Sequence, residues 1–170
     1  MDCLKSEDKM SKGIMRVYYG EGHGKSTAAF GTVVREIAKG KTATIISFLR
    51  EKNEDNEVLY KKLEPELKFF RFEKSESSFQ ELSEEEKQEE RMNLRNGFNY
   101  SKKVVSTGEC DLVVLDEILE LVETGIISEE ELLELVAAIP EDMVLICTGR
   151  VLRESILECA DEVYQVTLEK

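Results

Sequence analysis

The chain has 170 residues, 41% hydrophobic and 35% charged, which fits one globular domain rather than a disordered chain. No apolar run approaches the roughly 20 residues of a membrane-spanning helix, so the composition excludes a membrane-embedded protein. The formal net charge of −13 argues against nucleic acid as a partner, because its phosphates would be repelled.

Residues 1–12 are polar and mixed in charge, unlike a signal peptide, and we expect them to form a flexible leader of a cytoplasmic protein. Residues 13–170 contain neither an internal repeat nor a low-complexity linker, which predicts a single domain. The four cysteines are far apart and form no CxxC pair. We therefore expect free core cysteines rather than disulfides or zinc ligands.

Strand-like and helix-like segments alternate, which predicts an α/β fold with a mostly parallel sheet flanked by helices. Apolar and β-branched runs predict strands at Ile14–Tyr19, Thr42–Leu49, Leu67–Phe72, Asp111–Asp116, Met143–Cys147 and Glu162–Thr167. Helical spacing and capping signals predict helices at Ser26–Lys39, from Ser83 to about Val105, and from Ser128 to just before Pro140.

Two features qualify these helices. Gly97 lies inside the second one and weakens that prediction, since glycine costs about 1 kcal/mol relative to alanine in a helix. The acidic runs Glu81–Glu90 and Glu129–Glu134 are expected to be solvated helix faces rather than binding sites.

A glycine-rich segment, Gly20-Glu21-Gly22-His23-Gly24-Lys25-Ser26-Thr27, follows the first predicted strand and opens the first predicted helix. Glycines let the backbone turn so that successive N–H groups face phosphate oxygens, and the helix adds the positive end of its dipole. Lys25 supplies a mobile charge and Ser26 a hydroxyl ligand for Mg²⁺. These residues predict a binding site for a nucleotide triphosphate, with a ligand-free turn as the alternative.

The loop is one residue shorter than the usual G-x-x-x-x-G-K-[ST] pattern, because Tyr19 stands where its first glycine is expected. His23 is the only histidine, and it either contacts phosphate or is a solvated loop side chain.

Two further strands end in charged residues. The strand Leu112-Val113-Val114-Leu115 ends in Asp116-Glu117, which would place these acids beside the loop at the carboxyl edge of a parallel sheet. Both acids are candidate Mg²⁺ ligands, and the sequence leaves open which one binds directly. Arg150 follows the strand Met143–Cys147 and is either a cation at the same edge or a surface arginine.

The segment from Gly20 to Gly31 resembles the shortened G-x-G-x-G-K-[ST]-T-A-A loop of the P-loop-type ATP:corrinoid adenosyltransferases. Val113 to Ile118 is similar to the acidic strand of that family, and Thr148-Gly149-Arg150 is similar to its later strand end. Ala160-Asp161 resembles the family's alanine–aspartate step near the C-terminus. The resemblance spans about Arg16 to Val166 and implies a P-loop NTPase-like domain.

The resemblance also implies a reaction. Co(I) of a reduced corrinoid, either cobalamin or a precursor such as cobyrinic acid a,c-diamide, would attack the 5′ carbon of ATP and release triphosphate. Lys25, Glu117 and Arg150 would be catalytic, the loop would hold ATP, and Ser26, Asp116 and Glu117 would hold Mg²⁺. Family members are commonly homodimers and receive reduced corrinoid with the help of flavoproteins.

The chain departs from the family pattern in several places. His23 replaces a usual lysine, Ser47-Phe48 replaces Gln-Phe, and Val151-Leu152-Arg153 replaces small residues and proline. No tryptophan is present, and Phe79 is the nearest candidate for the family's aromatic residue near the corrinoid. Two other hypotheses stay open: a diverged P-loop phosphotransferase or ATPase that releases ADP, and a non-catalytic nucleotide- or corrinoid-binding paralogue.

Overall fold

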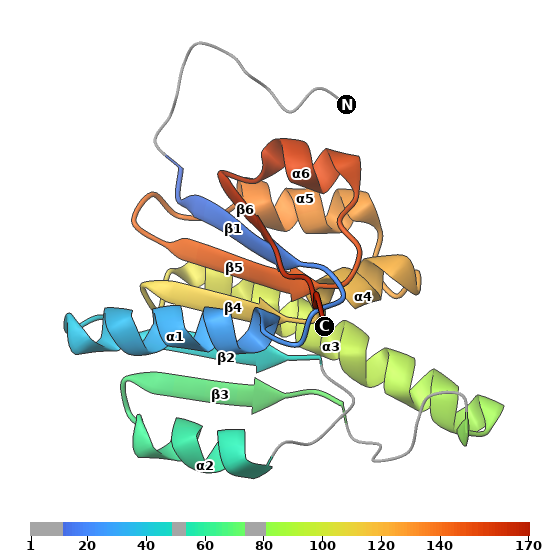
Figure 1. The fold of residues 1–170 in the computed structure, drawn as a ribbon. Coiled ribbons are helices and arrows are strands. Elements are labelled where there is room, and N and C mark those ends of the chain that lie inside the picture. Colours follow the sequence, from blue (N-terminus) through green and yellow to red (C-terminus); the bar gives the residue numbers. More distant parts are fainter. Residues whose placement is uncertain (1–11, 49–53, 74–80) are drawn as a thin grey trace.

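The computed structural model describes residues 12–48, 54–73 and 81–170 (Figure 1). Its strands are β1 (Ile14–Tyr19), β2 (Ala43–Ser47), β3 (Leu67–Arg71), β4 (Leu112–Asp116), β5 (Val144–Gly149) and β6 (Glu162–Gln165). Its helices are α1 (Lys25–Ala38), α2 (Glu54–Lys62), α3 (Glu84–Thr107), α4 (Ile118–Glu123), α5 (Glu129–Ala137) and α6 (Glu154–Cys159). The six predicted strands are confirmed.

The strands form one six-stranded sheet in the order β3-β2-β4-β5-β1-β6. Every neighbouring pair is parallel. The predicted parallel α/β fold is therefore confirmed. Because the strands run in one direction, their carboxyl ends meet at one edge, where ligands bind in such folds.

The two faces of the sheet are buried under different helices. Figure 1 shows α1 across the front of the sheet and α3 behind it. Alternate residues of β4 divide between the two sides: Leu112 and Val114 join a cluster with Ala29 of α1. Val113 and Leu115 join a larger cluster with α3, α4, α5 and α6. This two-sided burial explains why β4 is apolar without alternation.

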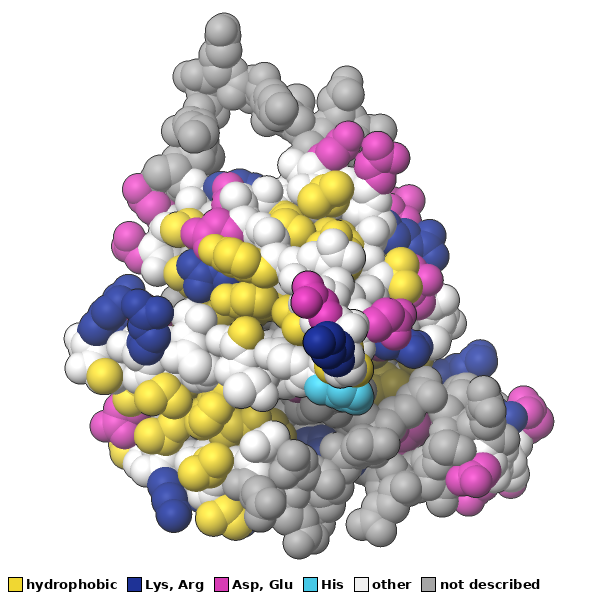
Figure 2. Space-filling model, in the orientation of Figure 1, with side chains coloured by type: hydrophobic (Ala, Val, Ile, Leu, Met, Phe, Trp, Pro, Cys, Tyr) yellow, Lys and Arg dark blue, Asp and Glu magenta, His cyan; other side chains and the backbone are white. Residues whose placement is uncertain are grey.

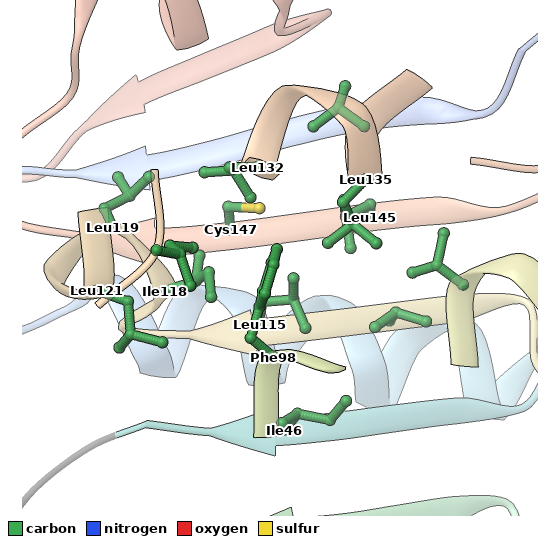
Figure 3. Packing of buried hydrophobic residues seen from close by; sticks show 14 of the residues in the cluster. Ile46, Phe98, Leu115, Ile118, Leu119, Leu121, Leu132, Leu135, Leu145 and Cys147 are labelled. Atoms are coloured by element: carbon green, nitrogen blue, oxygen red, sulfur yellow. The ribbon is translucent and has the colours of Figure 1, made fainter. Parts of the chain in front are cut away.

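The larger cluster forms most of the core. Figure 3 shows Leu132 and Leu135 of α5 pointing toward Leu145 and Cys147 of β5, with Phe98 of α3 next to β4. Each of these side chains is at most 3% exposed. The cluster fixes β4 and β5 side by side, which sets the spacing of the groups at their carboxyl ends.

The capping boxes are confirmed. Ser83 and Ser128 accept hydrogen bonds from the N–H groups of Glu86 and Glu131, whose carboxylates bind back to the cap residues. The predicted first helix is also present, and Gly40 (φ +86°) follows its C-cap.

Gly97 belongs to α3 for a packing reason. A Cβ atom there would lie 2.7 Å from Cγ of Phe72 and 2.9 Å from Cε1 of Phe48. Helix α3 thus approaches these aromatic rings more closely than a larger residue permits. The prediction of a fully solvated acidic run is wrong at Glu90, which is 4% exposed because it shares a helix face with buried Leu94.

Three short helices were not predicted. Helix α2 has exposed apolar residues, Val58 and Leu59, so it lacks a clear apolar stripe. Helices α4 and α6 have only six residues each, which is too short for a helical period to stand out from the adjoining strands.

Among the described cysteines, Cys110 and Cys147 are free, and Cys147 is fully buried as expected. The expectation is wrong at Cys159, which is disulfide-bonded and lies half-buried at the end of α6 rather than in the core. Most of the predicted leader, and Phe79, lie outside the described residues. No helix within the described ranges is long and apolar enough to cross a membrane.

Candidate active site

The candidate site lies at the carboxyl edge of β1, β4 and β5. Strand β1 lies beside β5, with Tyr19 opposite Gly149, and β4 lies on the other side of β5, with Leu115 opposite Cys147. The glycine loop, the Asp116-Glu117 pair and Arg150 extend from these three strand ends. The fold thus brings together three segments that are far apart in the sequence, at the edge where the sequence analysis expected them.

The first glycines of the loop have a conformational role. Gly20 has φ +120°, and its N–H donates to the carbonyls of Gly149 (3.2 Å) and Arg150 (3.1 Å). Gly22 donates to the Val166 carbonyl at 3.0 Å. A Cβ atom on Gly20 would lie 2.3 Å from that same carbonyl oxygen. The start of the loop is therefore held between the end of β5 and the segment after β6, and only glycine fits at its first position.

The amino terminus of α1 lacks a protein cap. Gly24 occupies the N-cap position without a side-chain hydrogen bond, and the first turn contains no acidic residue. Gly24 and Thr27 are exposed. The positive end of the α1 dipole can therefore accept an external anion.

Lys25 is the buried cation of the loop. Its side chain is 7% exposed, and its ammonium donates to the carbonyls of Gly20 (2.7 Å) and Gly22 (2.8 Å). These bonds place a positive charge inside the curve of the loop. The charge also lowers the pKa of both Asp116 and Glu117, against larger effects of burial. A phosphate group entering the loop would meet this charge directly.

Asp116 accepts two hydroxyl hydrogen bonds. Its Oδ1 atom accepts from Ser26 Oγ at 2.7 Å and from Thr148 Oγ1 at 2.8 Å. Burial raises the pKa of this carboxyl group, while the two hydroxyl donors oppose the rise. The sequence prediction placed Ser26 and Asp116 in one metal site, and the fold brings them into direct contact.

Glu117 has an unusual backbone and an unusual acidity. Its φ is +64°, and among the described non-glycine residues it alone has a positive φ. Burial, followed by the charge of Asp116, raises the pKa of Glu117 to about 7. A half-buried carboxyl group with a pKa near neutrality, next to another acid, is typical of functional sites.

Arg150 is exposed and ion-paired. Its guanidinium donates to both carboxylate oxygens of Glu120 in α4, at 3.3 and 3.2 Å, and its backbone N–H donates to the same carboxylate. Glu120 is the main cause of the raised pKa of Arg150, with smaller effects from Glu21 and Glu117. Arg150 therefore lies at the rim of the site rather than within the Asp116 hydrogen-bond network.

The remaining predicted loop residues are at the surface. Glu21 and His23 are exposed. Figure 2 shows the single histidine, in cyan, on the outer surface of the molecule. A ligand can reach His23, but within the described residues no hydrogen bond ties it to the Asp116 network.

Sequence reasoning missed two residues of the site. Thr148 is fully buried and bridges Asp116 and Glu117, and Glu120 binds Arg150. A signal for Thr148 existed, since it is a polar residue at the end of an apolar strand beside Arg150. Glu120 gave none, because α4 itself was not predicted.

The donor atoms fit Mg²⁺ better than a transition metal. The described residues contain no group of three or more His, Cys, Asp or Glu side chains that could hold a metal ion. Ser26 and Asp116 supply hard oxygen donors in contact with each other. Mg²⁺ is usually held by one or two such ligands together with water and substrate phosphates. The residues present fit that coordination.

A parallel sheet whose first βα loop ends in Gly-Lys-Ser, beside a strand that ends in an acid, defines the P-loop class of nucleotide-binding folds. The fold is similar to that of a KaiC-like protein from the hyperthermophilic archaeon Pyrococcus horikoshii, with a TM-score of 0.58 and 19% sequence identity. That similarity covers 93% of this chain and 74% of the archaeal chain, and it concerns the fold alone.

The chain belongs to the family described as ATP:corrinoid adenosyltransferase BtuR/CobO/CobP, which it matches over residues 11–170. It is 27% identical to the corrinoid adenosyltransferase of Escherichia coli, over 98% of this chain and 82% of the relative. It is 28% identical to corrinoid adenosyltransferase CobA of Salmonella typhimurium, with the same coverage. The predicted family resemblance is therefore confirmed.

Proposed function

We propose that this chain transfers the 5′-deoxyadenosyl group of ATP to Co(I) of a reduced corrinoid and releases triphosphate. The observation that carries the proposal is the short glycine loop with Lys25 enclosed in it, 2.7 and 2.8 Å from two loop carbonyls. Its shortened spacing is the one through which the sequence resembles the family to which the chain belongs. A site of this kind binds the leaving group rather than attacking the substrate.

The proposed reaction needs no protein nucleophile. The electron pair of Co(I) forms the cobalt–carbon bond, the bond from C5′ to the triphosphate oxygen breaks, and its electron pair leaves with triphosphate. The protein has to position ATP and stabilise the negative charge that develops on the leaving oxygen. Lys25, the loop N–H groups and the α1 dipole are suited to this task, with His23 as a further phosphate contact.

We assign Mg²⁺ to the donors at the strand ends. Ser26 and Asp116 would hold it, with Glu117 beside them, and the ion would neutralise part of the triphosphate charge when bound. Ser26 can donate its hydroxyl proton to Asp116 while its lone pairs face a cation. The existing Ser26–Asp116 hydrogen bond is therefore compatible with metal binding.

Arg150 and Glu117 form the rim of the proposed site. Arg150 would stabilise the bound nucleotide from the end of β5, and Glu117 would balance the charge between Asp116 and Arg150. The chain would act in the cytoplasm as a homodimer and receive its corrinoid from a flavoprotein reductant, as the family resemblance implies.

The test is a product assay. The full chain would be mixed without oxygen with Mg²⁺-ATP and chemically reduced cob(I)alamin, and in parallel with reduced cobinamide as a truncated corrinoid. The cobalt–carbon bond would be followed by absorbance, and phosphate products by chromatography. We expect an adenosylated corrinoid and triphosphate in equal amounts.

Two other outcomes would contradict the proposal. ADP with an unchanged corrinoid would indicate a phosphotransferase or ATPase. Bound ATP with no product from either corrinoid would indicate a non-catalytic binding protein.

A further inference from the structure

We propose that Thr148 is a positioning residue that orients Asp116 and Glu117 for Mg²⁺-dependent nucleotide binding. The inference rests on the proposed function for its role in catalysis, but its binding test does not involve the corrinoid. Thr148 is 0% exposed at the end of β5, so it acts through its neighbours rather than by touching substrate.

The Thr148 hydroxyl joins two strand ends. It donates to Asp116 Oδ1 at 2.8 Å and accepts the backbone N–H of Glu117 at 2.8 Å. A hydroxyl can do both at once, because it carries one donor and two acceptor lone pairs. Valine has the same shape but can do neither. The side chain therefore fixes both consecutive acids to β5.

The bond to Asp116 determines which carboxylate oxygen stays available. Oδ1 accepts from both Ser26 (2.7 Å) and Thr148 (2.8 Å). Within the described part of the chain, Oδ2 accepts no hydrogen bond from any side chain or backbone group. Two hydroxyl donors on one oxygen hold the carboxylate in one orientation, with the second oxygen free for a cation.

The bond to Glu117 accounts for its backbone. A glutamate at φ +64° is strained, and such residues persist where their surroundings hold them. The Thr148 hydroxyl is the hydrogen-bond acceptor for the N–H of this strained residue. Without it, Glu117 would lose the contact that fixes it beside Asp116.

The test compares Thr148→Val with a matched control, Thr44→Val. Thr44 is a buried threonine (3% exposed) on β2, opposite Val113 in register. Both substitutions remove a buried hydroxyl, and Thr148→Val should destabilise the chain more, because its hydroxyl bonds a carboxylate and a backbone N–H. Only Thr148→Val should alter the response to Mg²⁺.

The measurement is ATP binding by calorimetry at a series of Mg²⁺ concentrations, with denaturation followed in parallel. We expect Thr148→Val to raise the Mg²⁺ concentration for half-maximal ATP binding about tenfold, the effect of one lost hydrogen bond to a charged group. Thr148→Ser, which keeps the hydroxyl, should restore most of the response, and Thr44→Val should leave it unchanged.

A folded Thr148→Val variant with an unchanged Mg²⁺ response would overturn the inference, as would an equal shift in Thr44→Val. If Thr148→Val does not fold, Thr148→Cys takes its place, since a thiol keeps the size but hydrogen-bonds weakly. Absence of Mg²⁺-dependent ATP binding in the unmodified chain would overturn the inference too. A shift in Mg²⁺ response without adenosyl transfer would refute only the proposed function.

Discussion

The body of the sheet and its carboxyl edge differ in the kinds of residue that they bury. In the body, four consecutive residues of β4, Leu112 to Leu115, are apolar and at most 2% exposed. At the edge, the next residue is a buried acid, Asp116, followed by Glu117 in a left-handed conformation. Lys25 is also buried there. Buried charge and backbone strain oppose folding and are found where function requires them.

This difference predicts a division of effects. Changes in the body should alter the free energy of unfolding and leave ATP binding intact. Changes at the edge should alter binding and turnover, in addition to any effect on the free energy of unfolding.

The largest expected effect is at the edge. Lys25→Ala should lower kcat/KM for adenosyl transfer about 100-fold or more, because a charge directed at the leaving group is lost. Lys39→Ala is the matched control, since exposed Lys39 caps the other end of α1 and pairs with Glu36 there, away from the loop. Steady-state kinetics would contradict the comparison if both variants lost activity equally.

The largest effect in the body is expected at Gly97. Gly97→Ala should lower the free energy of unfolding by about 2 kcal/mol, because a Cβ atom would be forced against Phe72 and Phe48. Chemical denaturation measures this loss, and calorimetry with ATP should show unchanged affinity in the folded fraction. A variant as stable as the unmodified chain would mean that α3 can move away from the aromatic rings.

Two neighbouring arginines, Arg150 and Arg153, test where the functional edge ends. Arg150→Ala should reduce ATP affinity about tenfold, the effect of one charge-assisted contact. Arg153→Ala should have no such effect, since Arg153 pairs with Glu123 and Glu129 rather than with a site acid. Both are exposed ion-paired side chains, so their effects on stability should be equally small. Equal losses of affinity would instead point to the general positive charge of this region.

The raised pKa of Glu117 should make the free energy of unfolding depend on pH. Its pKa is raised to about 7 in the folded chain, so the folded state holds this proton more tightly than the unfolded state. The free energy of unfolding must therefore fall as pH rises from the ordinary carboxyl range through 7. Glu117→Gln removes that contribution, about 1 kcal/mol after allowance for partial exposure.

Denaturation of the nucleotide-free chain between about pH 5 and pH 8 measures this slope. The glutamine variant should gain stability relative to the unmodified chain as pH rises. The pKa of Asp116 is also raised by burial, so part of the pH dependence should remain in the variant. Parallel pH curves for the two proteins would contradict the assignment.

The same contrast explains what could be predicted from the sequence. The body was predictable because β-rich runs such as Ile14–Tyr19 and capping boxes such as Ser128 with Glu131 are local patterns. At the edge, the glycine loop and the acid at the end of β4 were also recognisable as local patterns. The short helix α4 was not, since six residues leave no period to read.

The interactions among the edge residues could not be predicted. The contact between Thr148 and Asp116 depends on the register that sets Cys147 opposite Leu115. The hydrogen bond from the Lys25 ammonium to the Gly20 carbonyl depends on the curvature of the loop. Both are tertiary features, and the roles we assign to these residues stay predictions until the variants are measured.

The smallest effect is expected at Gly31. A substitution there tests helix propensity alone, without the packing clash expected at Gly97. Gly31 lies inside α1, where a Cβ atom would have nothing within 4 Å, whereas Gly97 in α3 faces two aromatic rings. Gly31→Ala should therefore raise the free energy of unfolding by about 0.5–1 kcal/mol, because alanine is the better helix former. Thermal denaturation with and without Mg²⁺-ATP measures this gain. If the variant instead lost activity, the exposed face of α1 would belong to the functional edge, and the boundary between the two regions would have to move along that helix.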